Sequence, residues 1–406
     1  MVPRYFEGLA GGAETLLGLL AAKLSARGDD VTLLCTCAKD NRTWENEFEA
    51  GETRIHSLRV LRFPVDQRDL ERWIPIQVAI HEGKSVSYED QLTWIQESVN
   101  SRALYQYIAN HGPSYDAIFF GPYLFGTTFW GSQIYPEKSV LVPCLHDEPY
   151  AYLDVIASMF RRVKGCLFNA APEMHLARSL YGEVRGGVVG MGFDRAEDQE
   201  VPTMEPYLPV ENPYILYLGR KEMGKNVHRL IDYFCEAKDR GLLPEAVRLA
   251  ILGGGSFADL HREEVLRRGD VIDLPHVSEL DKQRLLQHAL FLCQPSQNES
   301  FSIVLMEAWL AGAPVVVHGE CAVTKSHVLE SAGGLYISSA TDLAGVTRYM
   351  LENPAERLRL AENGRRYVVE HYSWQATLER FDSVMRDLAP SSIEIAHQVD
   401  HAWTDV

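Results

Sequence analysis

The chain has 406 residues, of which 46% are hydrophobic, so it is long enough for two or three globular domains with cores of their own. Its 56 acidic residues outnumber 39 basic ones, and the net charge of −17 argues against a protein that binds nucleic acid by neutralising phosphates. No apolar run is long enough to cross a membrane and the N-terminus lacks a signal-peptide pattern, so we expect a soluble, cytoplasmic protein.

The first half of the chain alternates short β-branched runs with longer segments of helical periodicity, which predicts a parallel sheet covered by helices. The expected strands are residues 31–36, 117–121, 140–145, 166–169 and 187–189. Apolar residues at helical spacing predict two amphipathic faces, one formed by Leu16, Leu17, Leu20 and Leu24 and one by Leu92, Ile95, Val99 and Leu104.

Seven cysteines are scattered through these apolar runs, and none forms the C-x-x-C spacing of zinc or dithiol sites. We therefore expect reduced core residues and no metal site. An acidic run from Glu45 to Glu52 is most simply a solvated edge or loop.

Residues 66–111 form a long crossover that mixes charges with aromatic residues, among them Trp73, Trp94, Tyr105 and Tyr107. Two interpretations stay open: ordinary amphipathic helices that cover the first sheet, which aromatic residues at helical spacing favour, or an insertion that faces an acceptor substrate.

An acidic, proline-bearing stretch at 192–213 interrupts the periodicity and predicts an interdomain linker. A second set of strands follows at 214–218, 249–252, 271–274, 290–294, 315–318 and 335–337. We therefore predict two Rossmann-like, doubly wound α/β domains, and such sheets bind ligands at the carboxyl ends of their strands.

Two motifs contain glycine: Gly11-Gly12 before a helix, and Gly219-Arg220 after a strand. Gly11 and Gly12 precede the first amphipathic helix, where a ligand phosphate can approach the backbone and the helix N-terminus; the alternative is a plain turn. Arg220 follows the first strand of the second half and Lys225 lies five residues later, so the pair could neutralise a diphosphate without a metal. The alternative is two surface cations.

The segment after the strand at 290–294 carries Glu299 and, eight residues later, Glu307. An ionised carboxylate only accepts hydrogen bonds and can hold two vicinal hydroxyls of a ribose or hexose. The backbone from Ser300 to Ile303 opens a helix N-terminus toward a phosphate. Glu307 lies among apolar residues, so we expect it to have a partner that bears hydroxyls.

These motifs, together with the Tyr372-Ser373-Trp374 sequence, occur in the same order as in family 4 glycosyltransferases of the GT-B fold, which the chain resembles over nearly its whole length. The resemblance implies two Rossmann-like domains facing across a cleft, and a retaining transfer of a hexose-type sugar from a UDP- or GDP-linked donor to a hydroxyl acceptor. It also implies that no metal or other cofactor is needed.

The resemblance also suggests roles for individual residues. Arg220 and Lys225 resemble the pair that stabilises the departing diphosphate. Glu307 resembles the glutamate that holds the ribose, and Glu299 resembles the one beside the transferred sugar. The remaining assignments are Ser300, Phe301 and Ser302 near the sugar and phosphate, Gly12 with Gly11 facing the diphosphate, His146 beside the anomeric carbon, and Gly254 and Val277 in loops that flank the base. His146 could equally be a structural residue, and the two loops could be simple turns.

The predicted domains are an acceptor-binding domain at 1–192, a donor-binding domain at 193–372, a helix at 373–390 that packs back on the first domain, and a tail at 391–406. The family has an apolar strand before the Gly11-Gly12 turn, which this sequence lacks, so we expect the first strand to be missing or truncated. Expected partners are the donor and a glycan, lipid-linked or small-molecule acceptor. The Arg161, Arg162 and Lys164 cluster leaves peripheral contact with the inner face of the membrane open. Alternatives are a non-catalytic nucleotide-sugar-binding or partner protein, a nucleotide-sugar epimerase or a glycoside phosphorylase on the same scaffold.

Overall fold

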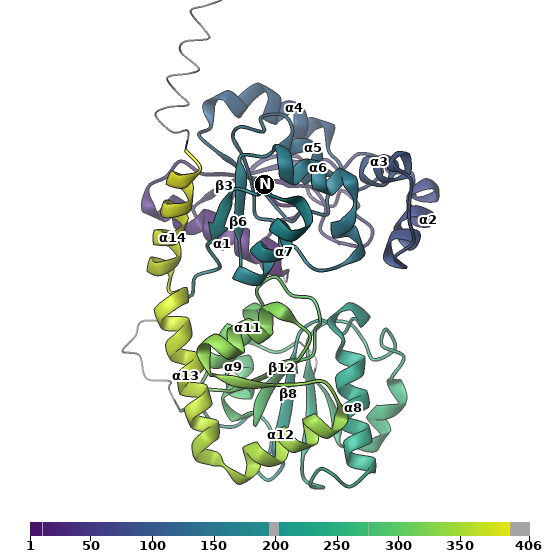
Figure 1. Ribbon diagram of the computed structural model, residues 1–406, viewed down its shortest axis with the longest axis vertical. Helices are drawn as coiled ribbons and strands as arrows, with labels where there is room; N and C mark the ends of the chain where they lie inside the picture. The colour runs from purple at the N-terminus through teal and green to yellow at the C-terminus, as the bar shows by residue number, and fades with distance from the viewer. Residues whose placement is uncertain (10, 195–202, 275, 390–406) are drawn as a thin grey trace, which may run out of the picture. The chain divides into compact units, whose positions relative to one another are not determined.

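The computed structural model describes residues 1–9, 11–194, 203–274 and 276–389. They form two compact units, one of Met1–Met191 with the described residues from Thr377 onward, and one of Gly192–Ala376 (Figure 1). Each unit has parallel strands with helices packed on them. None of the helices in the described residues is both long enough and apolar enough to span a bilayer.

The first unit contains two sheets. A parallel sheet contains β4 (Ile118–Phe120), β5 (Ser139–Leu141), β6 (Gly165–Phe168) and β7 (Gly186–Val188) in that order. These strands lie where they were predicted, although β5 ends earlier than expected. The other sheet contains β1 (Thr32–Thr36), β2 (Gly51–Ile55) and β3 (Leu58–Phe63) in the order β1-β3-β2.

The sequence did not predict the antiparallel hairpin of β2 and β3. Strand β2 is mostly exposed, so it lacks the apolar run that identifies a buried strand. Glu52, the last residue of the acidic run, lies on this hairpin and pairs with Arg59 at 2.9 Å.

Residues Met1 to Pro3 lie between the two sheets. The Val2 N–H donates to the Leu34 carbonyl of β1 at 3.0 Å, and the Met1 carbonyl accepts from Gly121, just after β4, at 3.3 Å. This short extended segment thus bridges β1 and β4, in the place where the sequence led us to expect a missing or truncated strand.

The helices of the first unit are α1 (Gly12–Arg27), α2 (Leu70–His81), α3 (Tyr88–Gln96), α4 (Arg102–His111), α5 (Gly126–Ser132), α6 (Asp154–Arg162) and α7 (Ala171–Tyr181), with short 3₁₀ turns at η1 (Gly112–Ser114) and η2 (Pro149–Tyr152). The predicted leucine face of α1 is confirmed, since its four leucines are buried.

The single helix predicted from Leu92 to Leu104 is wrong, because the chain breaks between α3 and α4. The Asn100 amide donates to three backbone carbonyls, including that of Ile95, and so ends α3. The Ser101 side chain then accepts from the Leu104 N–H and starts a new helix.

The second unit is a parallel sheet in the order β10-β9-β8-β11-β12-β13. Its strands are β8 (Tyr214–Leu218), β9 (Arg248–Leu252), β10 (Val271–Leu274), β11 (Phe291–Gln294), β12 (Val315–His318) and β13 (Gly334–Ile337). All were predicted to within a residue at each end, because strands buried on both faces are continuous apolar runs.

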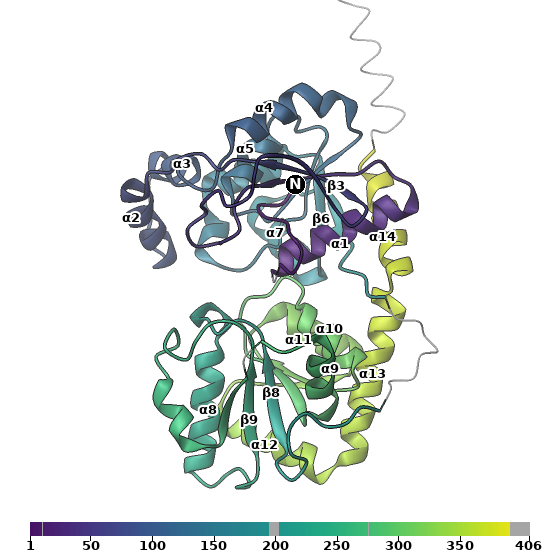
Figure 2. The ribbon, with the colours of Figure 1, turned by 180° about the vertical axis from the view of Figure 1, so that it is seen from behind.

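Helices cover both faces of this sheet (Figure 2). Helix α8 (Val227–Asp239) packs against α12 (Ala340–Glu352), while α10 (Ile303–Leu310) and α11 (Ala322–Ser331) pack against α13 (Pro354–Tyr372). The remaining elements are α9 (Glu279–His288), η3 (Met223–Lys225) and η4 (Glu263–Arg268).

The last helix, α14 (Trp374–Asp387), joins the first unit from Thr377 onward. Arg27 of α1 pairs with Asp382 at 2.8 Å, and Phe381 contacts Phe119. The predicted tail at 391–406 and part of the predicted linker, 195–202, lie outside the described residues.

The cysteines are unpaired, and six of the seven are buried. Within the described residues no three or more His, Cys, Asp or Glu side chains gather closely enough to hold a metal ion.

Candidate functional site

The loops that follow β10, β9, β8 and β11 lie side by side along one edge of the second sheet, because the strands are parallel and adjacent in that order. This edge carries the predicted residues of the second unit: Arg220, Lys225, Gly254, Val277, Glu299, Ser300, Phe301, Ser302 and Glu307. Gly11, Gly12 and His146 lie in the first unit.

Lys225 and Glu299 form an ion pair. The Lys225 ammonium donates to Glu299 Oε1 at 2.7 Å, and the Gln294 amide donates to the same oxygen at 3.4 Å. The Glu299 side chain is 10% exposed and that of Lys225 28%. The pair therefore fastens the loop after β8 to the loop after β11, and holds a cation and an acceptor carboxylate at one point.

Arg220 does not join this pair. Its side chain is about half exposed, and one guanidinium nitrogen forms an ion pair with Glu222 Oε1 at 2.9 Å. Its carbonyl accepts from the hydroxyl of the buried Tyr217 at 2.8 Å, which fixes the backbone of the loop and leaves the guanidinium at the surface.

The turn from Ser300 to Ser302 leads into α10. Ser302 adopts a left-handed conformation (φ 75°), which is uncommon for a residue other than glycine. Its hydroxyl is buried and has no hydrogen-bond partner within the described residues. The first N–H groups of a helix lack intrahelical acceptors and attract anions, so this turn is suited to phosphate or sugar oxygens.

Phe301 contributes to this turn only through its backbone. Its ring is 3% exposed and contacts Phe193, His327 and Tyr372. The side chain therefore belongs to the core of the second unit.

Glu307 is paired with a lysine that the sequence analysis overlooked. Lys282 of α9 donates to Glu307 Oε1 at 2.8 Å. Burial lowers the pKa of Lys282, but Glu307 and Glu279 outweigh it, so the pKa lies above its ordinary value and the lysine stays charged. The sequence led us to expect a partner of Glu307 that bears hydroxyls, but within the protein its partner is the Lys282 ammonium, which bonds to Oε1. Glu307 Oε2 has no hydrogen-bond partner in the described residues.

Val277 lies half-buried just before α9, whose first turn is capped by Ser278. The helix that carries Lys282 therefore starts directly after the loop predicted to flank a base. Nothing else in the sequence marked Lys282, because its partner lies 25 residues away.

The glycine loop after β9 is held by Lys221, a second residue that the sequence analysis did not single out. The Lys221 side chain is 3% exposed; its ammonium donates to the Gly253 carbonyl at 2.6 Å and pairs with Asp273 at 2.8 Å. Its N–H donates to the Gly254 carbonyl at 2.7 Å. Lys221 thus joins the loops after β8 and β9 to strand β10.

The glycines of this loop are not equivalent. A Cβ on Gly253 would collide with the Gly219 carbonyl, and one on Gly255 would lie 2.9 Å from the Lys221 carbonyl, whereas one on Gly254 would meet no atom within 4 Å. The close approach of the two loops therefore requires Gly253 and Gly255, and Gly254 contributes its carbonyl.

In the first unit, Gly11 has an internal reason for being glycine. A Cβ there would collide with the carboxylate of Glu14, which is buried and pairs with Arg4 at 2.9 Å. Gly12 has open space where a Cβ would lie. Of the two, Gly12 is the residue whose small size no neighbouring atom explains.

His146 follows β5 and lies near the carboxylate of Glu148, while a second carboxyl, that of Glu173, bonds to the preceding residue. Its Nδ1 lies 3.6 Å from Glu148 Oε1, which also accepts from the Tyr123 hydroxyl at 2.8 Å. The buried carboxyl of Glu173 accepts from the Leu145 N–H at 2.7 Å. Burial raises the pKa of Glu173 to about 8, against backbone N–H groups that lower it.

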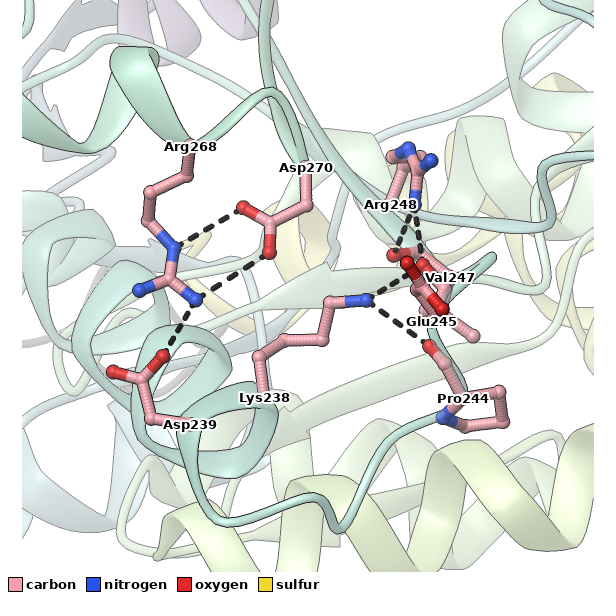
Figure 3. A network of polar contacts seen from close by, with 8 residues as sticks. All are labelled: Lys238, Asp239, Pro244, Glu245, Val247, Arg248, Arg268 and Asp270. Atoms are coloured by element: carbon pink, nitrogen blue, oxygen red, sulfur yellow. Dashed lines mark hydrogen bonds and ion pairs between the residues drawn. The ribbon is translucent and has the colours of Figure 1, made fainter.

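The opposite edge of the second sheet carries a different polar network (Figure 3). Arg268 bridges Asp239 and Asp270, while Lys238 donates to the Pro244 and Glu245 carbonyls. These residues lie near the amino ends of β9 and β10. Arg268 is paired with two carboxylates, whereas Lys238 bonds to backbone carbonyls. The network stabilises these turns. Because it lies at the opposite ends of the strands from the candidate site, substitutions in it can serve as controls.

Comparisons with known proteins agree with the fold and with the predicted resemblance. Residues 204–367 match the family model described as glycosyl transferases group 1. A D-inositol 3-phosphate glycosyltransferase of Xylanimonas cellulosilytica is 32% identical over 177 residues, which cover 41% of this chain and 40% of that protein. An MMP alpha-(1->4)-mannosyltransferase of Mycolicibacterium hassiacum is 32% identical over 132 residues, 28% of this chain and 29% of that protein. The chain thus spans less than half the length of these curated relatives.

Solved structures match over nearly the whole chain. The sucrose-phosphate synthase of Thermosynechococcus elongatus has a TM-score of 0.66 at 17% identity, covering 93% of this chain and 94% of that one. The Anabaena protein Alr3699/HepE, in complex with UDP and glucose, has a TM-score of 0.66 at 18% identity, covering 95% and 98%. The resemblance predicted from the sequence is therefore confirmed: residues 204–367 match the glycosyl transferases of group 1, and the chain as a whole has the fold of the GT-B glycosyltransferases.

Proposed function

We propose that this protein is a retaining glycosyltransferase that moves a hexose-type sugar from a UDP- or GDP-linked donor to a hydroxyl acceptor. The observation that carries the proposal is the Lys225–Glu299 pair beside the Ser300–Ser302 turn. It sets a cation, a carboxylate that accepts hydrogen bonds and a helix N-terminus at one edge of the second sheet. The group 1 match and the named relatives support the same activity.

In this proposal the diphosphate lies against the N-terminus of α10, with Lys225 and Arg220 neutralising the charge that develops as it leaves. Glu307 Oε2 accepts hydrogen bonds from the ribose, and Glu299 accepts from the transferred sugar. The acceptor oxygen bonds to the anomeric carbon as the bond from that carbon to the diphosphate breaks, and the acceptor proton passes to the leaving diphosphate. Because Lys225 and Arg220 supply positive charge, we propose that no metal or other cofactor is required.

The first test is donor binding. UDP-, GDP- and ADP-sugars are screened by thermal unfolding, where a ligand at 100 times its dissociation constant adds about 2.7 kcal/mol to stability. The sugar that stabilises is then supplied with candidate acceptors, and release of the nucleotide diphosphate is measured with and without EDTA. Stabilisation without release on any acceptor would indicate a non-catalytic sugar-nucleotide-binding protein.

The second test is the Lys225→Ala variant, for which we expect kcat to fall by about 10²- to 10³-fold, the loss typical of a group that stabilises transition-state charge. Lys238→Ala is the matched control, because it removes an ammonium from the opposite edge of the same sheet (Figure 3). Equal activity of the two variants would refute the assignment of Lys225.

The location of the protein stays a prediction: cytoplasmic, with peripheral contact at the inner face of the membrane as the finer possibility. Of the basic cluster, Arg162 donates to Gln133 and Arg161 to the Tyr181 carbonyl, so both side chains have partners on the first unit. A vesicle sedimentation assay with anionic lipid tests the contact.

A further inference from the structure

A cavity of about 550 Å³ lies in the first unit, within the volume range of small-molecule sites. One wall is the turn between α2 and α3, which contains Gly83–Val86, and the other is the segment from Asp147 to Asp154 that directly follows His146. The long crossover at 66–111 thus forms half of a cavity beside the histidine that the resemblance associates with the reacting carbon.

Both walls are held in place by partly buried hydrogen bonds and by an aromatic contact. Trp94 of α3 stacks on Tyr150 with 5.7 Å between ring centroids, and the Gln77 amide of α2 donates to the Tyr150 hydroxyl at 2.6 Å. The Gln91 amide of α3 donates to Asp154 Oδ2 at 3.2 Å. The cavity is therefore built into the fold, and a ligand need not order it.

The lining is rich in hydrogen-bond acceptors. Among the described residues that line the cavity, the carboxylates are Asp147, Glu148 and Asp154, and the one ammonium is that of Lys84, which already pairs with Glu82 at 2.5 Å. Like charges repel more strongly in a partly desolvated cavity than in water, so a phosphate or carboxylate ligand would be disfavoured here. Hydroxyl groups, by contrast, donate to carboxylates.

An aromatic ring completes the cavity. The Tyr152 side chain is 61% exposed, although its hydroxyl is anchored to Asp147 Oδ1 at 2.7 Å. A fixed ring with an open face next to several acceptors suits the apolar face and the hydroxyl edge of a pyranose or a cyclitol.

Resting on the proposed function, we propose that this cavity is the acceptor subsite and that it takes an uncharged polyhydroxylated acceptor, a sugar or cyclitol without a phosphate ester. Two lining carboxylates connect the cavity to His146, the residue that the resemblance associates with the reacting carbon. Asp147 is the next residue in the chain, and Glu148 Oε1 lies 3.6 Å from His146 Nδ1. The proposed acceptor carries no phosphate, whereas the name of the D-inositol 3-phosphate glycosyltransferase that the chain resembles contains a phosphorylated cyclitol.

The test compares matched acceptor pairs: myo-inositol with D-myo-inositol 3-phosphate, and methyl α-mannoside with mannose 6-phosphate. UDP-glucose and GDP-mannose are the donors, and nucleotide release with product mass is the readout. We expect the uncharged member of a pair to be at least tenfold better in kcat/KM. A better rate with the phosphate ester would overturn the proposal.

Two variants tie the result to the cavity. Tyr152→Ala is expected to raise the acceptor KM about tenfold while the donor KM stays unchanged. The control is Tyr88→Ala, which removes a ring that is 54% exposed on α3 but does not line the cavity. Asp154→Lys is expected to shift preference toward the phosphorylated member. Equal acceptor KM values for Tyr152→Ala and Tyr88→Ala would overturn the proposal.

Donor binding and slow donor hydrolysis need no acceptor, so measuring them tests the proposed function independently of the acceptor subsite. If neither occurs, saturation-transfer NMR with the free uncharged probes decides the subsite. Binding by the wild type that Tyr152→Ala abolishes and Tyr88→Ala retains supports it; no binding, or equal binding by all three proteins, overturns it.

Discussion

Lys221 offers the sharpest test of how the candidate site is held together. Replacing it with Met keeps an apolar stem of similar length in the buried space but removes the ammonium that bonds to the Gly253 carbonyl and to Asp273. The substitution therefore separates the polar contacts from the packing.

The expected loss follows from these two contacts. A hydrogen bond from a charged donor contributes about 1.5–3 kcal/mol, and an ion pair with a carboxylate that is 39% exposed, as that of Asp273 is, adds about 0.5–1 kcal/mol. Since the two share one ammonium, we expect the loops to open more easily by about 2–3 kcal/mol. This is roughly a 30- to 150-fold larger open population.

Native-state hydrogen exchange with mass spectrometry measures this opening locally. The N–H groups of Gly219 and Lys221 donate to the Leu252 and Gly254 carbonyls at 3.0 and 2.7 Å, so both should exchange faster in Lys221→Met. Lys238→Met is the control, since Lys238 holds carbonyls at the other edge of the sheet (Figure 3). Unchanged exchange at Gly219 and Lys221 in the Lys221→Met variant would refute the reasoning.

Three further predictions concern other residues of the two units. Glu307→Gln should raise the donor KM about tenfold with little change in kcat, because it weakens ground-state and transition-state binding alike; calorimetry with the nucleotide checks it, and unaltered affinity contradicts it. Gly253→Ala should destabilise the second unit by more than about 1 kcal/mol while Gly254→Ala is nearly neutral, since only the first meets backbone; thermal unfolding of both variants distinguishes them. Burial raises the pKa of Glu173 from 4.5 to about 8, so between these pH values the folded protein binds more protons at this carboxyl than the unfolded chain does. The stability that this protonation contributes is fully present below about pH 4.5 and is lost as the pH rises through 8. Denaturant unfolding at pH 5 and 8 should show a steeper loss for wild type than for Glu173→Gln; parallel losses would show that Glu173 is not the group responsible.

The sequence by itself determined the architecture of the second unit and the edge at which its site lies. Strands such as Tyr214–Leu218 and Val315–His318 were predicted without error, because a strand buried on both faces is a local apolar run. Once the strands are parallel, the residues that follow them share an edge, so the proximity of Lys225 and Glu299 was predictable from their places after β8 and β11.

The first unit was less predictable, because its elements are short and their limits depend on single side chains. Strand β2 of the β2–β3 hairpin is mostly exposed and has no apolar run. The boundary between α3 and α4 depends on the bonds of the Asn100 amide to backbone carbonyls, which no periodicity reveals.

Only the tertiary structure decided which charged side chains form ion pairs with one another. Lys282 pairs with Glu307 across 25 positions and Lys221 with Asp273 across 52, while Arg220 turns to its neighbour Glu222 instead of joining Lys225. A side-chain pair depends on the spatial approach of two loops, and sequence spacing does not encode that approach. For the same reason the cavity beside His146 became visible only when the turn between α2 and α3 was seen to meet the segment from Asp147 to Asp154.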